Sequence, residues 1–177
     1  ELLQIRRDKL AELQSEGRDP FEVTKFNVTH KASEIKDNYT EEDRELTKRG
    51  SDEVEIIKAK ISALNGQKVT VAGRIMSKRG MGKVGFIHIA DITGQIQLFV
   101  KKDILGEEEY NRFKKLDIGD ILGADGEVFT TQTGEISIRA EKLTLLSKSL
   151  LPLPEKFHGM TDTDLRYRQR YVDLIMN

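Results

Sequence analysis

QKVTVAGRIMSKRGMGKVGFIHIADITGQIQLFVKK, residues 67–102, is the stretch that decides the fold of this 177-residue chain. Apolar and polar residues alternate along it in three runs, and the breaks between the runs fall at residues 79–83 and 91–94. Because successive side chains of a β-strand point to opposite faces, the alternation predicts three consecutive strands with one face toward a core. In the last two strands the core face consists of Ile87, Ile89, Ile96, Leu98 and Val100.

The opposite face of these two strands carries two aromatic residues, Phe86 and Phe99, beside His88 and Gln97. Residues 66–102 contain seven basic side chains and one acidic one, a local charge of +6. Aromatic rings stack on unpaired bases and an amide can read a base edge, so such a face is typical of single-stranded nucleic-acid binding. An ordinary half-buried sheet, whose aromatic residues pack under a neighbouring element, explains the same pattern. This stretch alone does not separate the two interpretations.

Composition narrows the class of protein. The chain is 37% apolar and 33% charged with a net charge of −1, and residues 103–127 carry a local charge of −5. This separation of charge favours a polyanionic partner for the basic sheet. The chain has no cysteine, so we expect no disulfide framework and no metal site built on thiolates. No apolar run approaches the ~18 residues of a membrane helix and no signal peptide opens the chain, so we expect a cytoplasmic protein without a membrane partner.

Residues 1–65 are predicted to form a helical extension that packs on the sheet domain. Residues 2–16 have leucines near helical spacing and mixed charges. Residues 29–60 are polar and helical in character, and Thr40 with Asp43 resembles a capping box, in which two side chains satisfy free backbone N–H groups. Charged side chains in this region are interpreted as solvated helix faces.

Three glycines, Gly80, Gly82 and Gly85, form a G-x-G-x-x-G pattern. In a dinucleotide-binding fold this pattern must open a helix, but here strand patterns lie on both sides of it. A kinase-type glycine loop does bridge two strands, yet none of the other kinase motifs follows. The glycines are therefore interpreted as a flexible, basic hairpin.

The rest of the sheet domain, 66–149, completes a recognisable order of elements. Residues 103–116 have a helical pattern, and two further strands are predicted at 120–130 and 135–146. The order β-β-β-α-β-β is that of the OB-fold, a five-stranded Greek-key barrel whose second and third strands bind oligonucleotides. We therefore predict an all-β barrel core with an N-terminal helical extension, α+β overall. The aromatic face falls on the second and third strands, which favours nucleic-acid binding.

Residues 150–177 are predicted to form a linker. The sequence LPLP at 151–154 is typical of a stiff, extended connector, and residues 162–175, which include RYRQRYVDL, have a helical pattern. This helix is either a second RNA-binding patch or a hinge that packs between domains. The chain begins inside a helical pattern and stops directly after an apolar segment, so we expect a fragment of a longer protein.

Three segments carry a resemblance to a known family: VAGRIMSKRGMGKVGFIHIADITGQIQLFV (71–100), TTQTGEISI (130–138) and LLPLPEKFHGMTDTDLRYRQRYVDLIMN (150–177). They resemble the bacterial lysyl-tRNA synthetases, which are class IIb aminoacyl-tRNA synthetases. The resemblance implies that the barrel binds the anticodon loop of tRNA(Lys), and that the linker leads to a catalytic domain that activates lysine with ATP and Mg²⁺. It also implies that the intact enzyme is a homodimeric lysine–tRNA ligase.

Motifs of that catalytic domain do not occur in this chain. We therefore expect no catalytic residue and no cofactor here, and an inactive chain. Three alternatives remain open. The chain could be the equivalent domain of an aspartyl- or asparaginyl-tRNA synthetase, a general single-strand-binding module, or a barrel that binds another protein through its exposed aromatic residues.

The resemblance assigns anticodon recognition to four residues. Phe86 matches the stacking phenylalanine, Gln97 the glutamine that reads the central uridine, Glu135 the glutamate of the T-G-E motif, and Arg79 the basic residue before the hairpin. Strand alternation places Phe86 and Gln97 on the exposed face independently, but it puts Arg79 on the core face unless the first strand contains a bulge. From their face or their charge alone we add His88, Phe99, Lys78, Lys83 and Lys101 as candidate contacts.

Overall fold

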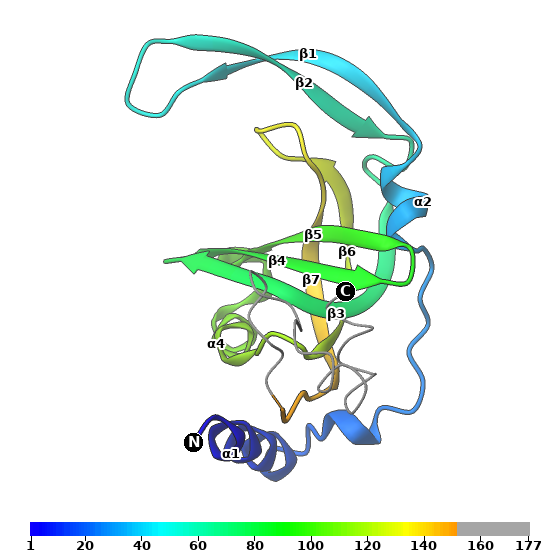
Figure 1. Ribbon diagram of the computed structural model, residues 1–177, viewed down its shortest axis with the longest axis vertical. Helices are drawn as coiled ribbons and strands as arrows, with labels where there is room; N and C mark the ends of the chain where they lie inside the picture. The colour runs from blue at the N-terminus through cyan, green and yellow to red at the C-terminus, as the bar shows by residue number, and fades with distance from the viewer. Residues whose placement is uncertain (152–177) are drawn as a thin grey trace, which may run out of the picture.

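Five strands close into a barrel in the order β3-β4-β5-β7-β6 in a computed structural model that describes residues 1–151 (Figure 1). Neighbouring strands are antiparallel except β5 and β7, which are parallel. Two short helices connect β5 to β6, so the predicted order β-β-β-α-β-β and the predicted barrel are confirmed. The elements are β3 (Lys68–Met81), β4 (Val84–Asp91), β5 (Gly94–Lys101), α3 (Lys102–Leu105), α4 (Glu107–Lys115), β6 (Ile121–Thr130) and β7 (Ile136–Ser147).

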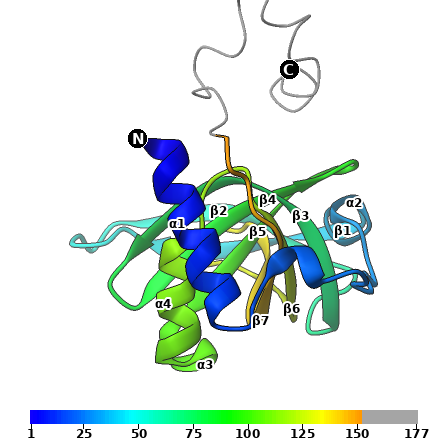
Figure 2. The ribbon, with the colours of Figure 1, turned by 90° about the horizontal axis from the view of Figure 1, so that it is seen from below.

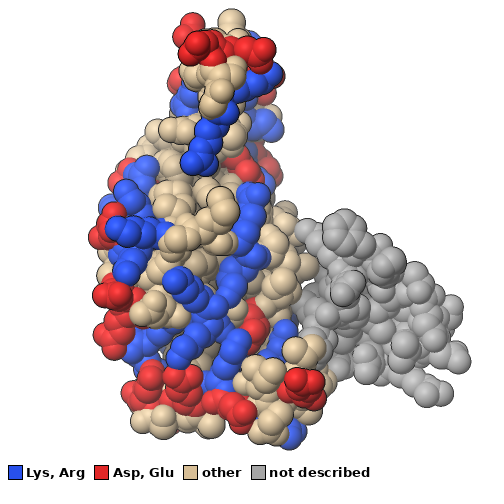
Figure 3. Space-filling view, turned by 90° about the vertical axis from the view of Figure 1, so that its left-hand side faces the viewer, with Lys and Arg blue, Asp and Glu red and all other residues tan. Residues whose placement is uncertain are grey.

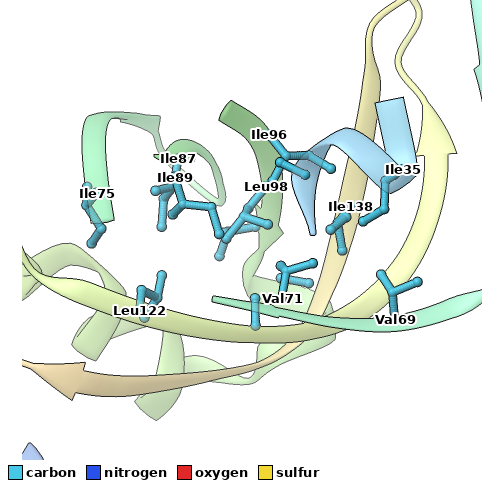
Figure 4. Packing of buried hydrophobic residues seen from close by; sticks show 14 of the residues in the cluster. Ile35, Val69, Val71, Ile75, Ile87, Ile89, Ile96, Leu98, Leu122 and Ile138 are labelled. Atoms are coloured by element: carbon cyan, nitrogen blue, oxygen red, sulfur yellow. The ribbon is translucent and has the colours of Figure 1, made fainter. Parts of the chain in front are cut away.

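The barrel interior is filled by the residues that the alternation assigned to it. The core-facing side chains of β4 and β5, namely Ile87, Ile89, Ile96, Leu98 and Val100, are at most 1% exposed. They pack against residues of the other strands, and Figure 4 shows Val71, Leu122 and Ile138 among these. Burying one such side chain contributes about 1.5–3 kcal/mol to folding. The core faces of both strands are therefore as predicted, and their other faces point outward.

Strand β3 contains a bulge, which is needed to bring Arg79 to the outer face of the barrel. Its register with β4 shifts between Ile75 and Ser77, so that one extra residue is inserted and the following side chains change faces. Ile75 is fully buried, whereas Arg79 lies opposite Phe86 on β4 and is exposed. The bulge predicted in the first strand of the barrel is confirmed.

Helix α1 (Leu2–Ser15) lies beside α4 (Figure 2) and is held there mainly by charged side chains. Lys9 pairs with Asp117 at 2.8 Å, and Lys115 pairs with Glu12 at 2.5 Å. No residue of α1 is buried, and a cavity of about 480 Å³ lies between the helix and the barrel. The predicted N-terminal helix is therefore present, attached to the barrel by ion pairs at its rim. Among the described residues, no helix combines the length and the apolar character needed to cross a membrane.

The helical prediction for residues 29–60 is wrong. After a 3₁₀ turn, η1 (Pro20–Glu22), and a short helix, α2 (Ala32–Lys36), the chain forms an antiparallel hairpin of β1 (Tyr39–Thr47) and β2 (Val54–Ser62). The proposed capping box cannot exist, because both of its residues lie in β1. The reason is that β2 is rich in valine and isoleucine, which favour strands, and that pairing with β1 outweighs the helical tendency of the many charged residues. The domain boundaries at 65 and 149 remain a prediction.

A buried ionic cluster joins the end of β7 to the segment between α4 and β6. Lys148 is almost fully buried, and its Nζ lies 2.8 Å from Asp120 Oδ2 and 2.5 Å from Asp117 Oδ2. The Asp120 carboxylate also accepts hydrogen bonds from the backbone N–H groups of Asp117 and Ser149. Burial alone would raise the pKa of Asp117, but hydrogen bonds from Lys148 and Lys9 outweigh it and hold that pKa below its usual value. The cluster stabilises the exit from the barrel in its charged form.

Candidate nucleic-acid interface

Three phenylalanines form a row on the outer face of the barrel. The ring centroids of Phe86 on β4 and Phe99 on β5 are 5.3 Å apart, and those of Phe99 and Phe129 on β6 are 5.7 Å apart. All three side chains are half-buried, so part of each ring remains accessible. The predicted pair Phe86 and Phe99 is therefore brought together. Phe129 has no local signal in the sequence that places it here, because it reaches this face only when the barrel closes.

An arginine lies over each end of this aromatic row. The guanidinium carbon of Arg79 is 5.4 Å from the centroid of Phe86, and that of Arg139 on β7 is 4.4 Å from the centroid of Phe129. Arg139 is also 3.8 Å from a carboxylate oxygen of Glu127. Guanidinium groups over aromatic faces are favourable cation–π contacts and leave donors free for phosphate or base atoms. The row therefore has a positive charge at both ends.

Polar residues of β4, β5 and β7 lie opposite one another on these neighbouring strands, next to the aromatic row. His88 on β4 is opposite Gln97 on β5, and Gln97 is opposite Ser137 on β7. The Nδ1 atom of His88 is 3.1 Å from Ser77 Oγ, and its Nε2 atom is 3.6 Å from Glu135 Oε1. Three of the predicted residues, His88, Gln97 and Glu135, are therefore neighbours.

Gln97 lies on the outer face as predicted, but it is not exposed: only 3% of its surface is accessible. Strand β5 lies between β4 and β7 here, so Gln97 is covered by its neighbours His88 and Ser137 on these two strands. Within residues 1–151 the hydrogen bond to this side chain is donated by Ser137 Oγ to Oε1, at 3.2 Å. A glutamine amide has two donors and a second acceptor position, so it retains groups for a base edge.

Glu135 is presented by the tight loop between β6 and β7. The loop is closed by hydrogen bonds from Thr131 N to Glu135 O, at 2.9 Å, and from Gly134 N to Thr131 O, at 3.0 Å. Gly134 has a φ of +87°, a conformation that glycine adopts without strain. The T-G-E motif thus builds a turn that sets the carboxylate of Glu135 at the edge of the polar group.

The three predicted lysines have different surroundings. Lys83 is exposed in the turn between β3 and β4, and Lys101 lies opposite Val84 with its Nζ 4.0 Å from Asp103. Both remain available to a phosphate.

The environment of Lys78 argues against the predicted contact with a phosphate. Its Nζ donates to the carbonyl oxygens of Lys114 and Leu116 at 2.7 and 2.6 Å, and burial lowers its pKa. Free carbonyl groups at a helix C-terminus attract a cation, so Lys78 caps α4 and is removed from the candidate phosphate contacts.

Figure 3 shows the side of the molecule on which the β3–β4 turn and the tip of the β1–β2 hairpin project. Lys and Arg side chains run in bands beside an uncharged centre, while Asp and Glu gather at the top and the bottom of the view. An uncharged centre between basic bands is suited to a single strand whose bases stack and whose phosphates lie outside. The arrangement can bind and read bases.

Comparison with known proteins gives two findings. A family model described as "OB-fold nucleic acid binding domain" matches residues 69–146. The chain is also similar to several lysine–tRNA ligases. It is 50% identical over 175 residues to that of Lactococcus lactis subsp. cremoris strain MG1363, 48% over 177 residues to that of Oceanobacillus iheyensis, and 49% over 173 residues to that of Clostridium perfringens strain ATCC 13124. These matches cover 98–100% of this chain but only 30–33% of each relative, so the chain spans about a third of their length.

Proposed function

We propose that the chain binds the anticodon loop of tRNA(Lys) as the anticodon-binding part of a lysine–tRNA ligase, and the match of residues 69–146 to the OB-fold nucleic-acid-binding family model supports this. The observation that carries the proposal is the row of three phenylalanines beside a glutamine and a glutamate on one outer face. Relatives that are lysine–tRNA ligases support it over a general single-strand-binding module, and over the aspartyl and asparaginyl enzymes. The intact enzyme would be a cytoplasmic homodimer that attaches lysine with ATP and Mg²⁺, and this chain alone would be inactive.

The side chains have distinct roles in this proposal. Phe86 supplies a stacking surface worth about 1–3 kcal/mol per base, and Phe99 and Phe129 extend it. Gln97 offers a donor and an acceptor to the edge of the central uridine. Glu135 accepts from an imino or amino group of a neighbouring base, with His88 beside it.

The charged groups position the strand rather than read it. Arg79 and Arg139 stack on the ends of the aromatic row or pair with phosphate, while Lys83 and Lys101 contact phosphates and set the register.

The proposal is tested by titrating the 177-residue chain with anticodon stem-loops that carry UUU or AAA. We expect tighter binding to UUU, because uracil edges match the amide of Gln97, and no lysine-dependent pyrophosphate exchange. Equal affinity for both loops would indicate a general single-strand-binding module. Salt-insensitive association with a protein and no RNA affinity would indicate a protein-binding barrel. Pyrophosphate exchange by this chain would contradict the inactivity that we propose.

We expect Lys83→Ala and Lys101→Ala to weaken binding to matched and mismatched loops alike. Each lysine that contacts a phosphate releases counterions, so losing one should reduce the slope of log affinity against log salt by about 0.7, the value for a single strand. Affinities measured between 50 and 300 mM salt check this. Lys142→Ala is the matched control, because this exposed lysine of β7 lines the cavity beside α1 instead. A changed base preference with an unaltered slope would show that the two lysines do not act through phosphates.

A further inference from the structure

The β1–β2 hairpin stands outside the barrel as a sheet of its own and arches over it (Figure 1). Its base is fixed to the barrel core: Ser62 Oγ donates to the carbonyl oxygen of Ile35 at 2.5 Å, and Ile35 is fully buried. Ala63 N also donates to Asn38 O at 2.8 Å, which closes the hairpin at its base. The hairpin is therefore a braced element and not a free arm.

Beyond its base the hairpin rests on the loop between β6 and β7. Lys60 N donates to Gly134 O at 3.1 Å, and Thr130 Oγ1 donates to Lys60 O at 2.6 Å. From β1, the Nη1 atom of Arg44 donates to Thr131 O at 3.1 Å. Three hydrogen bonds thus hold the loop from both strands of the hairpin.

The β1–β2 hairpin and the β6–β7 loop pack with their backbones in close contact. Ala59 is fully buried, and a Cβ atom placed on Gly134 would lie 3.0 Å from Ala59 Cα and 3.1 Å from Lys58 O. No larger side chain fits at position 134 without moving the hairpin or the loop. The alanine and the glycine are the small residues that allow this approach.

The same loop presents part of the candidate interface. Glu135 directly follows Gly134, and its carboxylate lies 3.6 Å from His88. Two residues further, Ser137 donates the hydrogen bond to Gln97. A shift of the loop would therefore move the carboxylate that faces the bases.

We propose that the β1–β2 hairpin is a clamp on the β6–β7 loop, and that Arg44 and Ala59 are positioning residues for base recognition by Glu135. This inference rests on the proposed function. The hairpin acts through the loop and not through contacts of its own with RNA. In agreement, residues 39–62 carry seven acidic and five basic side chains, a net charge of −2 that does not favour binding a polyanion.

The test compares Arg44→Ala, Arg44→Lys and Lys58→Ala in the full 177-residue chain. Lys58 is the matched control, since it lies on β2 beside Ala59 but pairs with Asp43 at 2.5 Å on the other face of the hairpin. Anticodon loops substituted at each of the three positions are titrated, and the position at which Glu135→Ala relaxes the preference identifies its base. We expect Arg44→Ala to reduce discrimination at that position about five- to tenfold, the effect of losing one hydrogen bond of about 1–1.4 kcal/mol. We expect Arg44→Lys to keep part of the discrimination that Arg44→Ala loses, and Lys58→Ala to leave the discrimination unchanged.

A double-mutant cycle separates positioning from direct contact. In the Glu135→Ala background, Arg44→Ala should have no further effect on discrimination. An equal effect in both backgrounds would mean that Arg44 contacts the RNA itself, and would overturn the proposal. Thr130→Val, which removes the hydroxyl that bonds to Lys60 O, provides a second variant with little change in shape.

A measurement without RNA keeps this inference separate from the proposed function. Amide exchange at Gly134 and Glu135 should be faster in Arg44→Ala and Thr130→Val than in the parent chain and Lys58→Ala. If the parent chain binds no anticodon loop but the exchange rates change as expected, the proposed function fails and the clamp stands. Unchanged exchange at both amides would overturn the clamp, whatever the RNA affinity.

Discussion

Lys148→Met is expected to destabilise the fold by about 3–5 kcal/mol, because it leaves the fully buried carboxylate of Asp120 without its cation. Methionine keeps nearly the volume of lysine, so the loss reports the charge rather than a cavity. Urea denaturation at neutral pH measures it.

The ion pair between Lys115 and Glu12 is the control for this change, because half of each side chain is exposed. Lys115→Met should cost about 1 kcal/mol or less, the usual value of a surface pair. Adding Asp120→Asn to Lys148→Met should recover part of the stability, since it removes the uncompensated charge. If Lys148→Met costs no more than Lys115→Met, the buried cluster does not stabilise the exit from the barrel.

The second large effect concerns binding. Phe86→Ala removes a ring on which any base can stack, so affinity for the matched loop should fall by about 1–3 kcal/mol while the preference for uridine changes less. Gln97→Ala leaves the aromatic row in place and removes the amide that distinguishes uracil from cytosine. It should therefore reduce discrimination between U and C at the central position by about 1–3 kcal/mol. Titration of both variants with the two loops, together with thermal melts, checks these expectations.

Because Gln97 is buried, replacing it should also affect the stability of the fold. Gln97→Ala also removes the acceptor of Ser137 Oγ, so we expect it to cost about 1 kcal/mol of stability. Ser137→Ala is the control, because it removes the same hydrogen bond and keeps the amide. Ser137→Ala should lower the stability about as much as Gln97→Ala does, and it should retain more of the preference for uridine. If Phe86→Ala collapses the melting temperature but leaves RNA affinity per folded molecule unchanged, Phe86 is a core residue and the interface is misassigned.

Several site residues were identifiable from local pattern and resemblance, while others depended on contacts between distant segments. Phe86 and Gln97 lie on the face that strand alternation gave them, and Arg79 reaches it through the bulge. Phe129 and Arg139 belong to strands that meet this face only through the parallel pairing of β5 with β7. Lys78 resembled a phosphate contact by its charge, but it binds the carbonyl end of α4, which only the packed structure brings near.

Local sequence pattern is sufficient to predict the strands of the barrel, their order along the chain and the outward face of β4 and β5. These features follow from a two-residue alternation and from turn glycines, which act within a few neighbouring residues. Three features have no local signal in the sequence: residues 39–62 form a hairpin, Gln97 is buried, and Arg44 holds the loop of Glu135. Those outcomes depend on pairing and packing between segments up to about ninety residues apart, because the free energy of such contacts outweighs local propensity.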